Sequence, residues 1–170
     1  MKTSLFFASL SATFVFTSVS LPAADPKGDE NFVHAAAQGG MLEVRLGKIA
    51  EKKAVRADVK EFGAMMASDH GKAGEKLKTV AAKKGLSIAP GLDAKHEAMV
   101  EKLDALPSGE FDKAYVTAMV KDHEEDVEEF RKAAKTAADP EVKAFAEETL
   151  PVIEKHLVRI KEISQEEKKK

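Results

Sequence analysis

Apolar residues recur at helical spacing along four stretches of this chain, and three of these stretches carry one histidine on the apolar face. The segment FGAMMASDH over 62–70 ends at His70, and a near copy, YVTAMVKDH, ends at His123. Side chains three, four and seven positions apart share one side of an α-helix, so these histidines, and His156 on a third stretch, are expected to point inward. The fourth stretch carries Glu43 at the edge of its apolar face. Packing these faces together predicts a helical bundle.

The residue composition supports an all-α chain. Aromatic residues make up 6% of the sequence and charged residues 33%, a balance typical of helical bundles, and no stretch alternates at period two as a strand would. A length of 170 residues suits one domain with a core. The net charge of -2 comes from 27 basic and 29 acidic residues interspersed along the helices, so nucleic acid is not expected as a partner. The absence of cysteine excludes disulfides and thiolate metal sites.

Residues 1–24 have the pattern of a cleaved secretory signal peptide. Lys2 supplies the positive end, an apolar run continues to Leu21, and small residues follow. Ser and Thr interrupt the run, which argues against a membrane span of ~20 apolar residues. We therefore expect a periplasmic or secreted protein with no transmembrane span after cleavage. The pattern allows cleavage after Ser20, Ala23 or Ala24.

The remaining residues, 25–170, are expected to form one bundle of four long helices. Asp29 suits a helix N-cap, Gly85 a C-cap, and Pro140 the first position of a helix. These signals predict long helices at about 29–53, 57–84, 109–137 and 140–164, with a short helix at about 93–105 in the connection between the second and third. The sequence leaves open whether the second and third long helices are parallel, because the connection could cap one end or return along the bundle.

Four inward residues fall at one depth in these helices and predict a metal site. Counted from the predicted helix starts, Glu43, His70, His123 and His156 each lie ~20–24 Å along their helix. One carboxylate and three imidazoles can hold a single transition-metal ion, with Zn, Cu or Fe as the expected metals. Asp69 and Asp122 directly precede their histidines and lie ~100° round the helix, so we expect them to support the site or form salt bridges rather than bind the ion.

The same four residues are also compatible with a buried polar layer without metal. In that case Glu43 accepts hydrogen bonds from the histidines and the layer sets the register of the helices. The protein would then be a structural or protein-interaction bundle. The chain contains no glycine-rich phosphate loop, GxSxG, HExxH or cysteine nucleophile, so we assign no catalytic or cofactor-binding residues.

The chain contains the signal-peptide pattern, the two DH pairs ending at His70 and His123, SGEFDKAYV from Ser108, and LPVIEKH ending at His156. Together these motifs resemble a bacterial family of exported proteins, domain-of-unknown-function family 4142, which is placed in the ferritin-like superfamily. The resemblance covers nearly all of residues 29–163 and implies a ferritin-like four-helix bundle with inward metal ligands. From the candidate metal site and the export signal together, we expect metal sequestration or a role in envelope stress. The Glu-x-x-His pattern of di-iron members is absent, because Ala67, Val120 and Ile153 precede the histidines by three positions.

Overall fold

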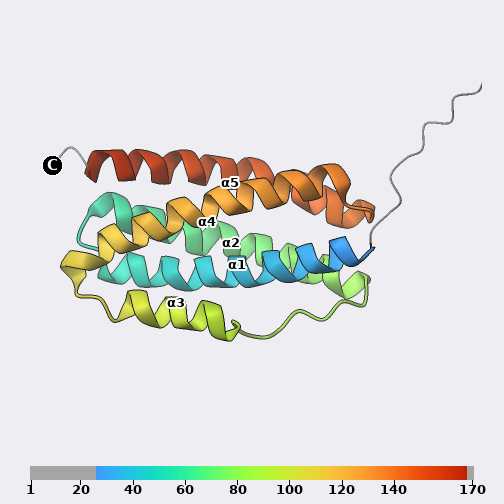
Figure 1. Cartoon of the computed structure of the whole chain (residues 1–170), viewed down its shortest axis with the longest axis horizontal. Helices are drawn as coiled ribbons and strands as arrows, with labels where there is room; N and C mark the ends of the chain where they lie inside the picture. Colours follow the sequence, from blue (N-terminus) through green and yellow to red (C-terminus); the bar gives the residue numbers. More distant parts are fainter. Residues whose placement is uncertain (1–25, 168–170) are drawn as a thin grey trace, which may run out of the picture.

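The computed structural model of the protein describes residues 26–167, so the segment interpreted as a signal peptide lies outside the described residues. Over this range the regular structure is entirely helical (Figure 1), which confirms the prediction of an all-α chain for the described part. Helix ends differ from the predicted ones by at most three residues, within the usual fraying of helix termini. The helices are α1 (Pro26–Lys53), α2 (Ala57–Lys83), α3 (Ala94–Asp104), α4 (Ser108–Thr136) and α5 (Pro140–Glu167).

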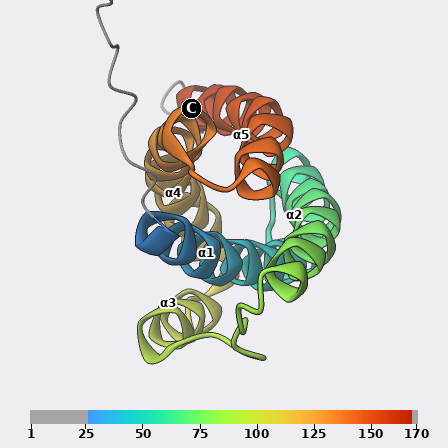
Figure 2. The same ribbon diagram turned by 90° about the vertical axis from the view of Figure 1, so that its right-hand side faces the viewer.

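The four long helices form a ring, with α3 outside it beside α1 (Figure 2). The α1–α2 and α4–α5 pairs are antiparallel hairpins (Figure 1). The segment from 84 to 107, which includes α3, runs back along the bundle, so α2 and α4 point in the same direction. This settles the direction that the sequence left open. At its start, Gly85 ends α2 with a positive φ of 67°, and the N–H of Leu86 donates to the carbonyl of Ala81 at 2.9 Å.

Each hairpin is held at its turn by a carboxylate from the other hairpin. Asp112 near the start of α4 accepts hydrogen bonds from the backbone N–H groups of Val55 and Arg56 in the α1–α2 turn, at 2.8 to 3.1 Å. Asp29 near the start of α1 accepts from two N–H groups of the α4–α5 turn, at 2.6 and 3.1 Å. Asp29 and Asp112 are 83 positions apart, and at this offset α1 nearly matches α4 and α2 nearly matches α5. The bundle therefore pairs two hairpins of equal length and register.

Two glycines allow a close approach between α1 and α2. A Cβ atom added to Gly47 of α1 would lie 2.5 Å from the carbonyl oxygen of Gly63 in α2, and one added to Gly63 would lie 2.7 Å from the carbonyl oxygen of Gly47. Both distances are too short for carbon and oxygen, so the backbones of α1 and α2 meet only because neither residue has a side chain.

The hydrophobic core consists of two clusters, one toward each end of the bundle. The histidines of α2, α4 and α5 fall between the two clusters, and Glu43 of α1 lies at the edge of the first cluster, next to Leu42. The first cluster has its largest members in Phe62, Phe111 and Tyr115, and the second in Phe32, Phe130 and Phe145. A buried polar layer thus separates two apolar regions.

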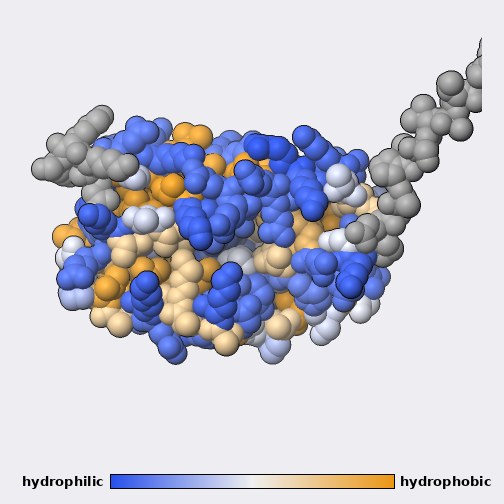
Figure 3. Space-filling view, viewed as in Figure 1, coloured by the Kyte–Doolittle hydropathy of each residue, from blue (hydrophilic) through white to orange (hydrophobic). Residues whose placement is uncertain are grey.

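The surface in the described range mixes polar and apolar residues. Figure 3 shows hydrophilic residues over most of one face, with smaller apolar areas between them. The large apolar side chains that are exposed are Val55, Val152 and Val158. Within residues 26–167, no helix has the length and apolar character needed to cross a membrane.

Candidate metal centre

The structure brings together the four residues that the sequence placed at one depth. Each long helix contributes one of them: Glu43 from α1, His70 from α2, His123 from α4 and His156 from α5. Their exposed fractions are 1%, 6%, 0% and 2%, so all four are buried. The ring centroids of the three histidines lie 5.2 to 5.7 Å apart. The ring of Phe62 covers one side of the cluster, with its centroid 6.0 Å from that of His123.

One nitrogen of each imidazole is held by an oxygen acceptor outside the three rings. Nδ1 of His70 lies 2.6 Å from Oε2 of Glu43, and Nε2 of His156 lies 3.2 Å from Oδ2 of Asp69. Nδ1 of His123 lies 3.0 Å from the backbone carbonyl oxygen of Met119. An ionised carboxylate or a carbonyl oxygen can only accept, so when Glu43 and Asp69 are ionised each of these nitrogens carries hydrogen and the rings are fixed in orientation. Histidines that bind metals are usually held in this way.

With the rings neutral and Glu43 ionised, the remaining nitrogens carry no hydrogen, and they face one another. Nε2 of His70 and Nδ1 of His156 are 3.3 Å apart. One ring nitrogen from each of His70, His123 and His156 lies within 4.8 Å of the other two. Three lone pairs that converge in a buried space repel one another, and a cation between them removes this repulsion.

A further pair of acceptor atoms supports this need for a cation. Oε1 of Glu43 and Nε2 of His123 are 3.4 Å apart, and both are buried without a hydrogen-bond partner among the described residues. Nδ1 of neutral His123 already donates to Met119, so Nε2 has no hydrogen to give to Glu43. Either a proton on Glu43 or a metal ion satisfies this pair.

Burial sets the charge of these groups. It lowers the pKa of His70 and of His156 to about 4, and it lowers the pKa of His123 to about 3 with a further contribution from the other two histidines. Burial, followed by the charge of Asp122, raises the pKa of Glu43 well above its ordinary value. The three imidazoles are therefore neutral at pH 7, the form that binds metal ions.

The two aspartates next to the histidines lie in different surroundings. Asp69 contacts His156 as described and also lies 3.4 Å from Nζ of Lys72 on its own helix. Asp122 is more enclosed, and its Oδ2 is buried without a partner in the described part of the chain. Burial raises the pKa of Asp122 to about 6. Oxygen atoms of Glu43 and Asp122 and a nitrogen of His123 form a second group of potential ligands within 4.8 Å of one another.

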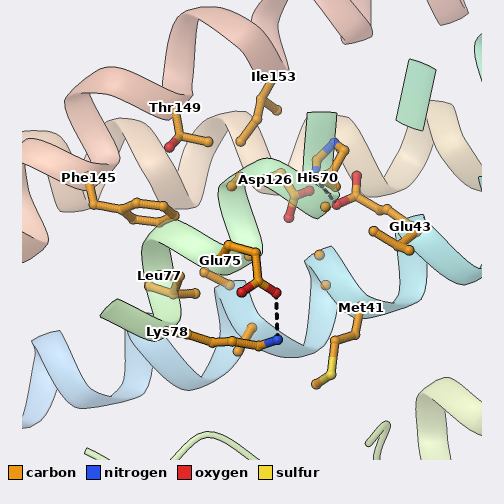
Figure 4. A pocket seen from close by; sticks show the side chains of 18 of the residues that line it. Met41, Glu43, His70, Glu75, Leu77, Lys78, Asp126, Phe145, Thr149 and Ile153 are labelled. Carbon is orange, nitrogen blue, oxygen red and sulfur yellow. Dashed lines mark hydrogen bonds and ion pairs between the residues drawn. The ribbon is translucent and has the colours of Figure 1, made fainter. Parts of the chain in front are cut away.

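A cavity of about 220 Å³ borders the cluster and exposes one acid that the sequence did not single out. Figure 4 shows Glu43, His70 and Asp126 together at one end of it. Asp126 lies in the run KDHEEDVEEF, which on charge alone has the appearance of a solvated helix face. Its position four residues after Asp122 and three after His123 is the signal for an inward location. Burial and the charges of Glu43 and Asp122 raise the pKa of Asp126 well above its ordinary value.

The sequence of this protein matches a known protein family. The model of the domain of unknown function DUF4142 matches residues 17–163. The chain belongs to the DUF4142 family. This confirms the resemblance inferred from the DH pairs and LPVIEKH. No curated protein matches the sequence.

Solved structures of another family of unknown function share the fold of this DUF4142 member. A DUF305 fragment from Deinococcus radiodurans superposes with a TM-score of 0.70 at 15% identity, covering 84% of this chain and 97% of that one. A putative secreted DUF305 protein from Streptomyces coelicolor gives a TM-score of 0.68 at 13% identity, covering 82% and 91%. At these identities the similarity concerns the helical bundle alone.

Proposed function

We propose that this protein binds one transition-metal ion, Zn, Cu or Fe, through His70, His123 and His156, and that it sequesters metal in the cell envelope. The observation that carries the proposal is the convergence of three ring nitrogens within 4.8 Å while the opposite side of each ring is held by an acceptor. Imidazole nitrogen suits each of these metals. Burial keeps the rings neutral, so protons do not compete with the ion near pH 7.

Glu43, which the sequence predicts as a fourth ligand, belongs to the proposed centre as the residue that holds His70. Its Oε2, at 2.6 Å from Nδ1 of His70, orients that ring, and its charge offsets that of the ion. Asp69 does the same for His156 at 3.2 Å. Asp122 lies near Glu43 and adds negative charge to this side of the centre. With these acids in place, a divalent cation meets opposite charge in a region that otherwise disfavours any charge.

The proposal includes a ferritin-like arrangement and export. Parallel α2 and α4, joined by a segment that returns along the bundle, support a ferritin-like topology rather than a simple up-down-up-down bundle (Figure 1). Export is supported by the pattern of residues 1–24. Mass spectrometry of the protein recovered from the periplasm tests it, because cleavage after Ser20, Ala23 or Ala24 gives three distinct masses.

Metal content and melting temperature test the metal proposal. Protein purified without a histidine tag is equilibrated with Zn²⁺ or Cu²⁺, passed over a desalting column, and analysed for bound metal. We expect about one ion per chain and a higher melting temperature, since a ligand at 100 times its Kd stabilises the folded state by about 2.7 kcal/mol. His123→Ala should lose both effects. His156→Gln keeps a polar side chain at its position and should also lose them, so that the loss is not explained by a folding defect. His34→Ala is the control, because His34 is exposed.

A metal-free polar layer is the competing function. The 2.6 Å contact of Glu43 with His70 and the 3.3 Å contact of His70 with His156 favour it. With a proton on Glu43 they form a short hydrogen-bonded chain, in which Glu43 donates to Nδ1 of His70 and Nε2 of His70 donates to Nδ1 of His156. This alternative predicts no retained metal and no melting shift in the wild type, together with a loss of stability in His123→Ala. Those results would reject the metal proposal.

A further inference from the structure

The cavity beside the centre reaches from the surface to Glu43 and His70 and is lined by all four long helices. Its volume of about 220 Å³ has room for about seven water molecules at ~30 Å³ each, or for an organic molecule with a similar number of heavy atoms. Glycines keep it open, since a Cβ atom added to Gly40 or Gly74 would meet no atom within 4 Å.

The inner end of the cavity is acidic and lacks a matching cation. Glu43 is 1% exposed, and its Oε1 has no hydrogen-bond partner in the described chain. Asp126 lines the same end (Figure 4). Lys78 is the basic residue of the lining, and its Nζ forms an ion pair with Oε1 of Glu75 at 2.8 Å. The cavity therefore offers carboxyl oxygen without a partner to a positively charged group, and such a group would hold both acids in their ionised form.

The walls away from these acids are apolar. Figure 4 shows Leu77 and Phe145 at the opposite end from Glu43, with Ile153 along one side. Phe130 and Ile88 complete this wall. Thr149 adds one hydroxyl to this side of the cavity (Figure 4), while the apolar side chains favour a hydrocarbon chain because its burial removes apolar surface from water.

We propose that this cavity binds a small organic cation, a protonated primary amine with a short apolar chain. The ammonium group lies at Asp126 and Glu43, and the chain packs against Leu77, Phe130 and Phe145. Apolar cavities with a few convergent polar groups are the common form of small-molecule sites. An anionic ligand of the same length would meet two acids, and a neutral one would leave both unpaired. This site extends beyond the proposed metal centre and does not depend on metal binding.

Calorimetric titration at pH 7.5 in metal-free buffer tests the proposal with three probes of equal chain length: hexylamine, hexan-1-ol and hexanoate. We expect saturable 1:1 binding of hexylamine, at least about tenfold weaker binding of hexan-1-ol, and no binding of hexanoate. Asp126→Asn should weaken hexylamine at least about tenfold, and Gly74→Leu, which places a side chain in the opening, should abolish binding. Glu128→Gln removes one charge from an exposed position of α4 and should change the Kd less than about twofold.

Three results would overturn the proposal: no saturable hexylamine binding to the wild type, equal affinity for hexan-1-ol, or unchanged affinity in Asp126→Asn. Circular dichroism of each variant verifies that it is folded. A wild-type protein that takes up no metal but binds hexylamine would reject the metal proposal and leave this one standing.

Discussion

Replacing Gly47 by alanine tests the close contact on which the geometry of the centre depends. The added Cβ atom would lie 2.5 Å from the carbonyl oxygen of Gly63, 3.0 Å from the backbone nitrogen of Ala67 and 3.0 Å from Cβ of Met66. Two of these neighbours are backbone atoms, which cannot rotate away as a flexible side chain could. The helices α1 and α2 must therefore separate, and Glu43 and His70 lie on these two helices, one turn away from Gly47 and Ala67.

Two opposing effects set the size of the change. Alanine is favoured over glycine inside a helix by about 1 kcal/mol, which stabilises the variant. Overpacking of a tight contact destabilises by about 1–3 kcal/mol, and contact with rigid backbone belongs at the upper end of this range. We expect Gly47→Ala to lower the free energy of unfolding by about 2 kcal/mol. Gly74→Ala adds its Cβ where no atom lies within 4 Å, so the same exchange should stabilise by up to about 1 kcal/mol.

Urea denaturation followed by circular dichroism measures both variants, with the midpoint and slope compared to the wild type. Metal uptake is a second measurement for Gly47→Ala. We expect it to decrease, because separated helices lengthen the 2.6 Å contact between Glu43 and His70. Equal stability of Gly47→Ala and Gly74→Ala would refute the contact between α1 and α2.

Three further predictions concern stability. Burial lowers the pKa of His123 to about 3, so between this value and the ordinary ~6.5 the unfolded state binds more protons than the folded state, and stability falls as the pH is lowered. Urea titrations of metal-free protein at pH 6 and 5 measure this loss of stability. The loss should be larger in the wild type than in His123→Asn by up to about 1.4 kcal/mol per pH unit. Asp112→Ala leaves two N–H groups of the α1–α2 turn without an acceptor and should lower the free energy of unfolding by about 1–2 kcal/mol, as should Asp29→Ala at the α4–α5 turn. Unchanged midpoints in chemical denaturation would contradict a stabilising role for these two carboxylates. Pro151 is exposed inside α5, so Pro151→Ala restores a backbone donor and should raise the melting temperature by the equivalent of about 1–3 kcal/mol, and a lower melting temperature would mean that the proline is needed there.

Much of the centre was predictable because an α-helix converts spacing into direction. The apolar positions around His70, His123 and His156 determine which side of each helix is buried, and the structure places all three rings there. Counting residues from the helix ends also gave the common depth of these histidines and Glu43. These are local properties of each helix, so the sequence carries them without knowledge of its neighbours.

The charge of the run in which Asp126 lies gave no indication of its inner position, which only its spacing from His123 indicates. Among acids spaced along a helix, charge does not distinguish a solvated carboxylate from one that faces a cavity. The distinction arises because Gly40 of α1 and Gly74 of α2 leave space near Asp126 of α4, and these residues come together only through packing. The same holds for the Oε1 of Glu43, whose lack of a partner depends on which nitrogen of His123 faces it.

The sequence by itself determined the helices, their inward faces and the depth at which one acid and three histidines lie. The tertiary structure decided that α2 and α4 are parallel, which acceptor holds each ring, and where a cavity meets the acids. The physical reason is that side-chain direction along a helix follows from its period alone. Helix order, helix direction and the pairing of individual atoms depend instead on contacts between residues far apart in the chain. His70 and His123 show this, because each lies about as far from one end of its helix as from the other, and their depth therefore fits either helix direction.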